Sequence, residues 1–122
     1  NANIFSMQSA LDSLSDYAGR RRRIAVLGDM FELGKAEEKI HRQVGRYAAN
    51  KTDILLACGK RARHLATAAA KAGLKNENII WTENKDEAAA KLKKITDRQD
   101  VILLKGSHGN ELWKIIDHFQ NS

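Results

Sequence analysis

Four short apolar runs, rich in Ile, Val and Leu, recur along the chain. They cover Arg23–Gly28, Asp53–Cys58, Asn78–Thr82 and Asp100–Leu104. None of them alternates strictly between apolar and polar positions, which is the pattern of strands whose two faces are both buried. The runs therefore predict four strands that are buried on both faces.

Around these runs, apolar residues recur at spacings of three and four, which is the period of an amphipathic helix. The first such stretch, Ser6–Tyr17, carries a continuous apolar stripe and has Ser6 in the position of an N-cap. Four further stretches with helical character are Ala36–Ala49, Arg61–Ala72, Lys85–Ile95 and Glu111–Phe119. Five helices are therefore expected.

The predicted order is α-β-α-β-α-β-α-β-α. Strands that alternate with helices indicate an α/β fold, here a Rossmann-like three-layer sandwich with a mainly parallel sheet and right-handed crossovers. In open parallel sheets, ligands bind beyond the carboxyl ends of the strands. Three strands end at a glycine or polar residue, at Gly28–Asp29, Cys58–Gly59 and Lys105–Ser107, and these turns are the expected site of function.

Composition fits one globular domain over residues 1–122, with 43% hydrophobic and 30% charged residues and no linker. The single cysteine, Cys58, excludes an intrachain disulfide and is typical of a small buried hydrophobe in a reducing cytoplasm. No apolar run approaches the roughly 18–20 residues that span a bilayer. The chain begins at Asn1 without an initiator Met, so we expect a piece of a longer protein or a processed product.

The net charge is +6, partly because of the run Arg20–Arg23. Such a run either binds nucleic acid or anionic lipid, or forms a solvated loop that leads into a strand. No aromatic residue adjoins it, so a platform for single-stranded nucleic acid is absent. We favour the loop and expect no nucleic-acid partner.

Asp29 follows the first strand, where Gly28 permits a tight turn. Its carboxylate either binds a ligand hydroxyl, an amine or a metal-bound water, or caps its own loop. The spacing is not that of a dinucleotide-binding glycine motif, and the chain has no phosphate loop. Four residues apart in the next helical stretch, Glu37 and His41 share one face, and a lone His there is more often structural.

The predicted turn with the most candidate binding side chains spans residues 105–109. It combines Lys105, Ser107 and His108 with two glycines, and a predicted helix follows. Backbone amides in such a turn suit a carboxylate or a phosphate, whereas the simpler interpretation is a turn capped by Ser107. No acidic residue lies near Ser107 in sequence, so a nucleophile triad is not indicated. His64, His108 and His118 form no ligand pattern with Cys58, so no metal site is expected.

Four stretches in a fixed order resemble the C-terminal domain of the Mur ligases, across essentially the whole chain. They are the Asn1-Ala2-Asn3 lead-in with Ser6-Met7, RRIAVLGDMFELG at Arg22–Gly34, EEKIHRQVG at Glu37–Gly45, and DVILLKGSHG at Asp100–Gly109. Two positions depart from the family pattern. Ile4 stands where the family has proline, and His108 where it usually has arginine, so a role that needs a fixed guanidinium is in doubt.

The resemblance implies a three-domain enzyme of bacterial peptidoglycan synthesis in the cytoplasm. In this family an N-terminal domain binds the UDP-sugar peptide, and a central domain binds ATP and Mg²⁺ through its phosphate loop. The C-terminal domain supplies the site of the incoming amino acid or dipeptide and closes over ATP. The match is best to the branch that adds D-Ala-D-Ala to UDP-N-acetylmuramoyl-tripeptide, through an acyl phosphate that the dipeptide amine attacks. The C-terminal domain alone is expected to be inactive.

The resemblance also suggests roles for the turn residues. Lys105, the candidate catalytic residue, and the amides of Gly106, Ser107 and His108 would bind the dipeptide carboxylate or the transferring phosphate. The competing interpretation is a stand-alone Rossmann-like module that binds a nucleotide or an anion.

Asp29 or Glu32 would hold the ammonium group of the dipeptide, and His41 would orient a carboxylate on their loop. Asn1 and Asn3 would lie near the nucleotide at an interdomain hinge. The large apolar residues of the loop, Met30, Phe31 and Leu33, are expected to pack either on their own domain or on the central domain.

Overall fold

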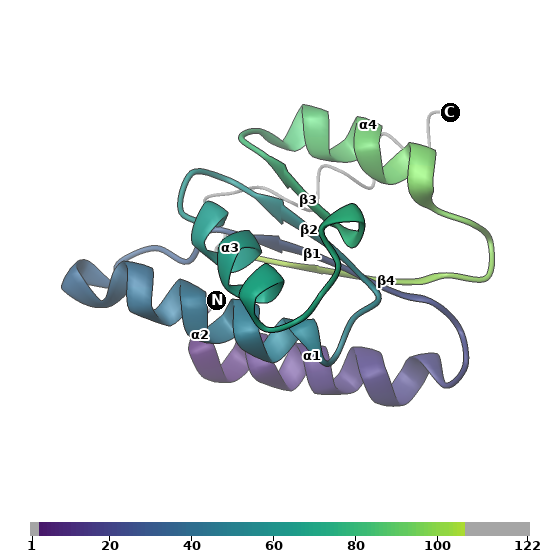
Figure 1. The fold of residues 1–122 in the computed structure, drawn as a ribbon, viewed down its shortest axis with the longest axis horizontal. Helices are drawn as coiled ribbons and strands as arrows, with labels where there is room; N and C mark the ends of the chain where they lie inside the picture. The colour runs from purple at the N-terminus through teal and green to yellow at the C-terminus, as the bar shows by residue number, and fades with distance from the viewer. Residues whose placement is uncertain (1–2, 107–122) are drawn as a thin grey trace.

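Four parallel strands form one sheet, in the spatial order β3-β2-β1-β4 (Figure 1). The computed structural model describes residues 3–106. Its strands are β1 (Arg23–Gly28), β2 (Ile54–Cys58), β3 (Ile79–Thr82) and β4 (Val101–Lys105). The predicted parallel sheet is confirmed, and its strands agree with the apolar runs to within one residue at each end.

Helices cover both faces of the sheet (Figure 1). Those on one face are α1 (Ile4–Ala18), α2 (Glu37–Ala49) and α3 (Arg63–Lys71), and α4 (Lys85–Ile95) covers the other. Two 3₁₀ turns, η1 (Gly34–Ala36) and η2 (Asn76–Asn78), precede α2 and β3. The predicted order and the three-layer architecture are confirmed, except that the helix expected over residues 111–119 lies outside the described residues.

Side-chain alternation along the two central strands builds two cores. Ala25 and Leu27 of β1 pack among the residues beneath α1, α2 and α3, whereas Ile24 and Val26 pack toward α4. All four are fully buried, because both faces of β1 are covered by helices. The outer strands differ, since Trp81 of β3 and Ile102 of β4 are 41% and 36% exposed. The expected burial on both faces therefore holds for β1 and β2 but not for Trp81 and Ile102, because β3 and β4 form the edges of the described sheet.

The start of α1 also differs from the prediction. Asn3, rather than Ser6, is the N-cap, and its side chain accepts a hydrogen bond from the backbone N–H of Ser6 at 2.9 Å. The Ser6 hydroxyl accepts in return from the backbone N–H of Asn3 at 3.0 Å. This reciprocal capping box satisfies two backbone donors, and it extends the helix by the two residues before Ser6.

The arginine run connects α1 to the amino end of β1. It therefore lies at the opposite end of the strands from their carboxyl ends. Arg22 pairs with Asp100 at 2.7 Å, and Arg23 pairs with Asp53 at 3.1 Å. Arg21 stacks over the ring of Tyr17, 4.9 Å from its centroid. Three of the four arginines thus contact neighbouring elements of their own domain.

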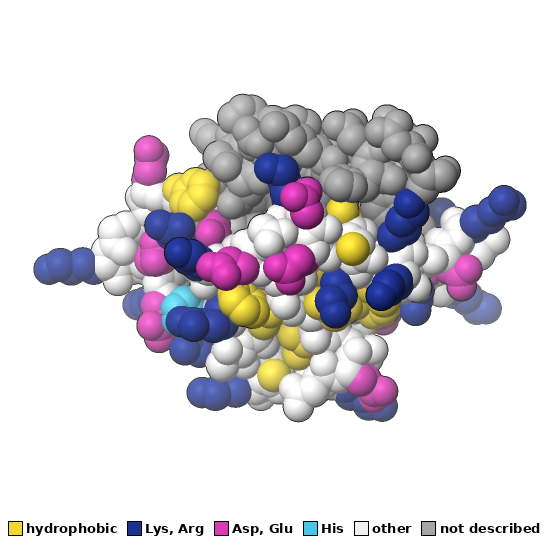
Figure 2. Space-filling model, turned by 90° about the horizontal axis from the view of Figure 1, so that it is seen from above, with side chains coloured by type: hydrophobic (Ala, Val, Ile, Leu, Met, Phe, Trp, Pro, Cys, Tyr) yellow, Lys and Arg dark blue, Asp and Glu magenta, His cyan; other side chains and the backbone are white. Residues whose placement is uncertain are grey.

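Charge elsewhere is mixed rather than segregated. Figure 2 shows basic and acidic side chains side by side over one face of the molecule. Among residues 3–106, no helix has the length and apolar character needed to cross a membrane.

Candidate functional site

The carboxyl ends of β1, β2 and β3 surround a pocket of about 330 Å³. It lies where ligands bind in open parallel sheets, and its volume is at the small end of the range of ligand sites, about 300–1,000 Å³. The lining comes from the ends of the strands, from the loop after β2 and from the loop and first turn after β3: Asp29, Cys58, Gly59, Lys60, Arg61, Glu83, Asn84, Lys85 and Asp86. The turns after Gly28 and Cys58 therefore meet in space, as the sequence predicts.

Asp29 ties the end of β1 to the loop that follows β2. One carboxylate oxygen, Oδ1, accepts a hydrogen bond from the backbone N–H of Ala62 at 2.8 Å. The other, Oδ2, lies 3.5 Å from Nη1 of Arg61. The residue is only 5% exposed, so most of its acceptor capacity faces its own domain. The Asp29 carboxylate therefore caps the loop after β2, and its binding of a ligand stays a prediction.

Gly59 lies directly against the Asp29 carboxylate. A Cβ atom added at Gly59 would stand 2.3 Å from Oδ1 of Asp29, far inside van der Waals contact. The backbone of Gly59 also has φ +123°, a conformation that side-chain-bearing residues rarely adopt. Only glycine therefore allows β2 to end so close to Asp29.

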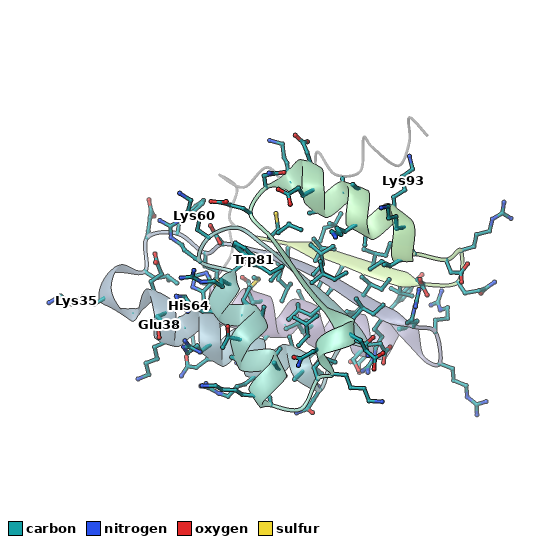
Figure 3. The ribbon with its side chains drawn as sticks, turned by 45° about the horizontal axis from the view of Figure 1, so that its top comes forward. Lys35, Glu38, Lys60, His64, Trp81 and Lys93 are labelled. Atoms are coloured by element: carbon teal, nitrogen blue, oxygen red, sulfur yellow. The ribbon has the colours of Figure 1, made fainter. Side chains whose placement is uncertain are left out.

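Hydrogen bonds from β3 also hold the loop after β2. The indole N–H of Trp81 donates to the carbonyl oxygen of Gly59 at 2.7 Å, and the N–H of Gly59 donates to the carbonyl oxygen of Thr82 at 2.9 Å. Lys60, the next residue, extends outward at the same end of the molecule as Trp81, while Lys93 of α4 lies at the other end (Figure 3). The backbone beside Lys60 and Arg61 is thus fixed by contacts with β1 and β3.

The Arg61 side chain contacts Glu37, Phe31 and Asp29. Its Nε–H donates to Oε1 of Glu37 at 2.6 Å, and its guanidinium lies over the Phe31 ring, 4.8 Å from the centroid. The hydrogen bond to Glu37 is the main cause that raises the pKa of Arg61. Sequence reasoning missed this residue because it placed Arg61 inside a helix, whereas α3 begins only at Arg63. The sequence signal that could have indicated Arg61 is its position two residues after Gly59, at the carboxyl end of β2.

His41, on α2, anchors the loop after β1. The imidazole is completely buried, and its Nε2 accepts a hydrogen bond from the backbone N–H of Met30 at 3.0 Å. Since a backbone N–H can only donate, the ring proton resides on Nδ1, which donates to the carbonyl oxygen of Glu37 at 2.7 Å. Burial lowers the pKa of His41, which keeps the ring neutral. His41 therefore acts on the backbone next to Asp29.

The apolar residues of this loop pack on their own domain. Met30 is fully buried in the core under α1–α3, and Leu33 packs against the same core. Phe31 is half-buried and lies beneath Arg61. These contacts explain why a loop after a buried strand carries three large hydrophobic side chains.

Glu32, by contrast, points away from the core. It is exposed, it has no hydrogen-bond or ion-pair partner among residues 3–106, and its backbone is left-handed, with φ 63°. A non-glycine residue in this region costs roughly 1 kcal/mol. The packing of Met30 and Leu33 on either side holds it there.

Lys105 ends β4 at the same edge of the sheet, because β4 pairs with β1 in a register that sets Lys105 opposite Leu27. Lys105 and Gly106 are half-buried. Asn3 begins α1 toward this end of the domain, where its side chain serves as the helix cap (Figure 1). The predicted site residues Asn1, Ser107 and His108 lie outside the described residues.

No group of three or more His, Cys, Asp or Glu side chains within residues 3–106 is arranged to hold a metal ion. Cys58 is one of the residues that line the pocket, and burial raises the pKa of its thiol.

Comparison with known proteins identifies the family. A family model described as the Mur ligase, glutamate ligase domain matches residues 1–108. The chain belongs to the Mur ligase family. The matched residues include the loop held by His41, the pocket at the carboxyl ends of β1–β3, and Lys105.

Two relatives of this Mur ligase domain share the same name, UDP-N-acetylmuramoyl-tripeptide–D-alanyl-D-alanine ligase. The Bacillus subtilis enzyme is 34% identical over 117 residues, which cover 95% of this chain and 25% of the relative. The Escherichia coli enzyme is also 34% identical, over all of this chain and 26% of its own. The chain thus spans about a quarter of the length of these relatives.

Solved structures show the same fold. A crystal structure of MurF from Acinetobacter baumannii superposes with a TM-score of 0.81 at 26% identity, covering 100% of this chain and 27% of that one. MurF from Thermotoga maritima, crystallised with ADP, has a TM-score of 0.77 at 21% identity, covering 99% and 26%. The Rossmann-like Mur ligase fold of this chain is therefore shown by structure as well as by sequence.

Proposed function

We propose that this chain is the C-terminal, substrate-closing domain of an ATP-dependent ligase that joins D-Ala-D-Ala to UDP-N-acetylmuramoyl-tripeptide in bacterial peptidoglycan synthesis. The observation that carries the proposal is the 34% identity to two ligases of that name over nearly all of the chain. We propose the three-domain organisation and the cytoplasmic location on the same relationship.

ATP and Mg²⁺ are assigned to a central domain of the longer enzyme. This chain has no phosphate loop, and residues 3–106 gather no set of metal ligands. The contribution of this domain is to bring the dipeptide amine to the acyl phosphate of the nucleotide substrate and to exclude water. Exclusion matters because water would hydrolyse the activated carboxyl group before the amine reaches it.

In the reaction, the amine nitrogen of the dipeptide bonds to the acyl carbon, the bond from that carbon to the phosphate oxygen breaks, and the amine loses a proton. We assign Lys105, at the end of β4, to balance negative charge on the leaving phosphate, together with the backbone amide of Gly106. We assign Ser107 and His108 to the same anion as Lys105, and Asn1 and Asn3 to an interdomain hinge beside the nucleotide.

The loop after β1 has a divided role in this proposal. Asp29 and His41 hold the loop in place, which the contacts with Ala62 and Met30 support. Glu32 is the carboxylate that the loop presents outward, and we assign it to the amino group of the dipeptide as it approaches the acyl phosphate.

The test is phosphate release by the full-length ligase that contains this domain. Release is expected only when ATP, UDP-N-acetylmuramoyl-tripeptide and D-Ala-D-Ala are all present, and the 122-residue chain alone is expected to release none. Release that does not depend on D-Ala-D-Ala, or turnover by the chain alone, would contradict the proposal. Tight binding of a nucleotide by the chain alone would favour the stand-alone binding module instead.

A further inference from the structure

A second hollow, of about 190 Å³, lies between α2 and α3, on the side of the sheet opposite to α4 (Figure 1). Among the described residues, its lining is Arg42 and Arg46 from α2 and Ala68 and Lys71 from α3. It therefore gathers three cationic side chains and no carboxylate. Its volume is below the range of ligand sites, about 300–1,000 Å³, so it does not suit a whole nucleotide.

Close packing of the two helices brings these cations together. A Cβ atom added at Gly45 of α2 would stand 2.3 Å from the carbonyl oxygen of Leu65 of α3, so only glycine allows the helices to approach this far. Arg46 follows Gly45 directly, and Lys71 is in the last turn of α3. Long side chains from two helices thus surround one hollow, although like charges brought together cost free energy.

The charge of this hollow is only partly balanced within the domain. Arg42 donates to Glu38 at 3.0 Å, whereas no hydrogen bond or ion pair holds the side chain of Arg46 or Lys71 among residues 3–106. The negative ends of the α2 and α3 dipoles offset about half a charge each. A net positive charge therefore remains, and Arg46 and Lys71 are both exposed.

These features favour a surface that carries many anions over a single bound ion. The hollow lies toward the carboxyl ends of α2 and α3, which present C=O groups, whereas free phosphate binds best to the N–H groups of a helix N-terminus. The donors are long side chains, and ordering them around one ion costs conformational entropy. Against a surface with many anionic groups, each cation finds a partner without that ordering, and the contributions add.

An exposed aromatic ring lies near the same group of helices. Arg46 also lines a hollow between α1 and α2, to which Ile4 and Tyr47 contribute. Phe5 follows Ile4 in the first turn of α1 and is 80% exposed. Cations beside an exposed phenyl ring match the interface of an anionic bilayer, where charged headgroups meet acyl chains. Duplex nucleic acid offers phosphates to the cations but no apolar layer to the ring.

We infer that the face formed by α1, α2 and α3 rests on an anionic phospholipid surface. Arg42, Arg46 and Lys71 contact the lipid phosphates, and Phe5 enters the boundary between headgroups and acyl chains. This contact does not depend on the proposed reaction, because Arg46 and Lys71 lie away from the carboxyl ends of the strands.

Sedimentation with phospholipid vesicles tests the inference in the full-length protein that contains this domain. The wild type is expected to bind vesicles of equal parts phosphatidylglycerol and phosphatidylcholine more tightly than vesicles of phosphatidylcholine alone. It should lose most of this binding in about 0.5 M salt, because salt screens the attraction. The double variant Arg46→Gln/Lys71→Gln should bind about 25-fold more weakly, at about fivefold for each cation removed.

The matched control is Lys91→Gln/Lys93→Gln, which removes the same charge from exposed positions of α4, on the other side of the sheet. Its binding should stay within about twofold of the wild type. Phe5→Ser should weaken binding by about fivefold and leave its salt dependence unchanged, because it removes apolar contact but no charge. All variants should unfold at the temperature of the wild type, since the altered side chains are exposed.

Three outcomes would overturn the inference. The first is a wild type that does not bind phosphatidylglycerol vesicles. The second is an equal loss of binding in the two double variants, because net charge alone would then account for it. The third is tighter binding to duplex DNA than to vesicles with the same sensitivity to Arg46→Gln/Lys71→Gln, which would assign this face to nucleic acid. Vesicle binding that follows the variants while the phosphate-release test fails would overturn only the proposed function.

Discussion

The Nε2 atom of buried His41 accepts a hydrogen bond from the backbone N–H of Met30, 3.0 Å away, across the gap between α2 and the loop after β1. The other ring nitrogen is occupied by the carbonyl oxygen of Glu37. This arrangement fixes the backbone of Met30, which is the residue next to Asp29. Asp29 in turn accepts a hydrogen bond from Ala62, in the loop after β2. One neutral imidazole thereby connects the helix to the wall of the pocket.

Replacing His41 by leucine should destabilise the domain strongly. The variant leaves the Met30 N–H buried without an acceptor and fits the cavity poorly, which together cost about 2–4 kcal/mol. Chemical unfolding of the purified chain measures the change. His64→Leu is the control, because the polar contacts of the His64 side chain within residues 3–106 are long, 3.8 Å to Glu38 and 3.5 Å to Arg42, and their loss should change stability by less than about 0.5 kcal/mol. Equal effects from the two variants would refute the anchoring role of His41.

Stability should also fall in mild acid because of His41. Its pKa is lower in the folded state than the ordinary value of 6.5, because burial disfavours the charged ring. The unfolded chain therefore takes up a proton first as the pH drops. The stabilisation is complete above pH 6.5 and is lost at up to about 1.4 kcal/mol per pH unit below it, until the folded pKa is reached.

The measurement is the free energy of unfolding between pH 7.5 and 5, for the wild type and for His41→Gln. The variant has no titrating group at this position, so its pH dependence should be shallower over the same interval. Parallel curves would show that His41 does not carry the effect. Asp53 and Asp100, whose pKa values are lowered from 3.8 by Arg23 and Arg22, act only in stronger acid.

Substitutions at two glycines distinguish the cost of a close contact from the cost of backbone strain. Gly59→Ala and Gly73→Ala both place a methyl group on a backbone with positive φ, at +123° and +110°. At Gly73 nothing lies within 4 Å of the added atom, whereas at Gly59 it would meet the Asp29 carboxylate. Gly59→Ala should therefore cost about 1–3 kcal/mol more than Gly73→Ala in chemical unfolding. Similar costs would mean that Asp29 moves aside freely.

Lys105→Ala should reduce ligation by the full-length enzyme by about 100-fold in kcat, since one cationic contact with developing charge is removed. Binding of UDP-N-acetylmuramoyl-tripeptide, measured by calorimetry, should not change. The control is Lys93→Ala, an exposed lysine of α4 at the other end of the domain (Figure 3). Unchanged kinetics for Lys105→Ala would remove this residue from the site.

Much of the fold follows from local pattern. Hydrophobic period distinguished strands from helices because a side chain faces the core every two residues in a strand and every three or four in a helix. The alternation of the two predicted the parallel sheet, and with it the edge at which Asp29, Gly59 and Lys105 stand. These inferences need no knowledge of which strands are neighbours.

The composition of the site was decided by tertiary structure. Arg61 meets Glu37 and Asp29 across 24 and 32 residues of sequence, which requires β2 beside β1 and α3 beside α2. Local sequence contains no signal for such pairs, and it equally cannot show that β3 and β4 are the edges of the described sheet. The sequence by itself determined the order of elements and the edge that carries function. Only packing decided that Asp29 and His41 hold the loops while Arg61 lines the pocket, because contacts between distant segments depend on strand order and register.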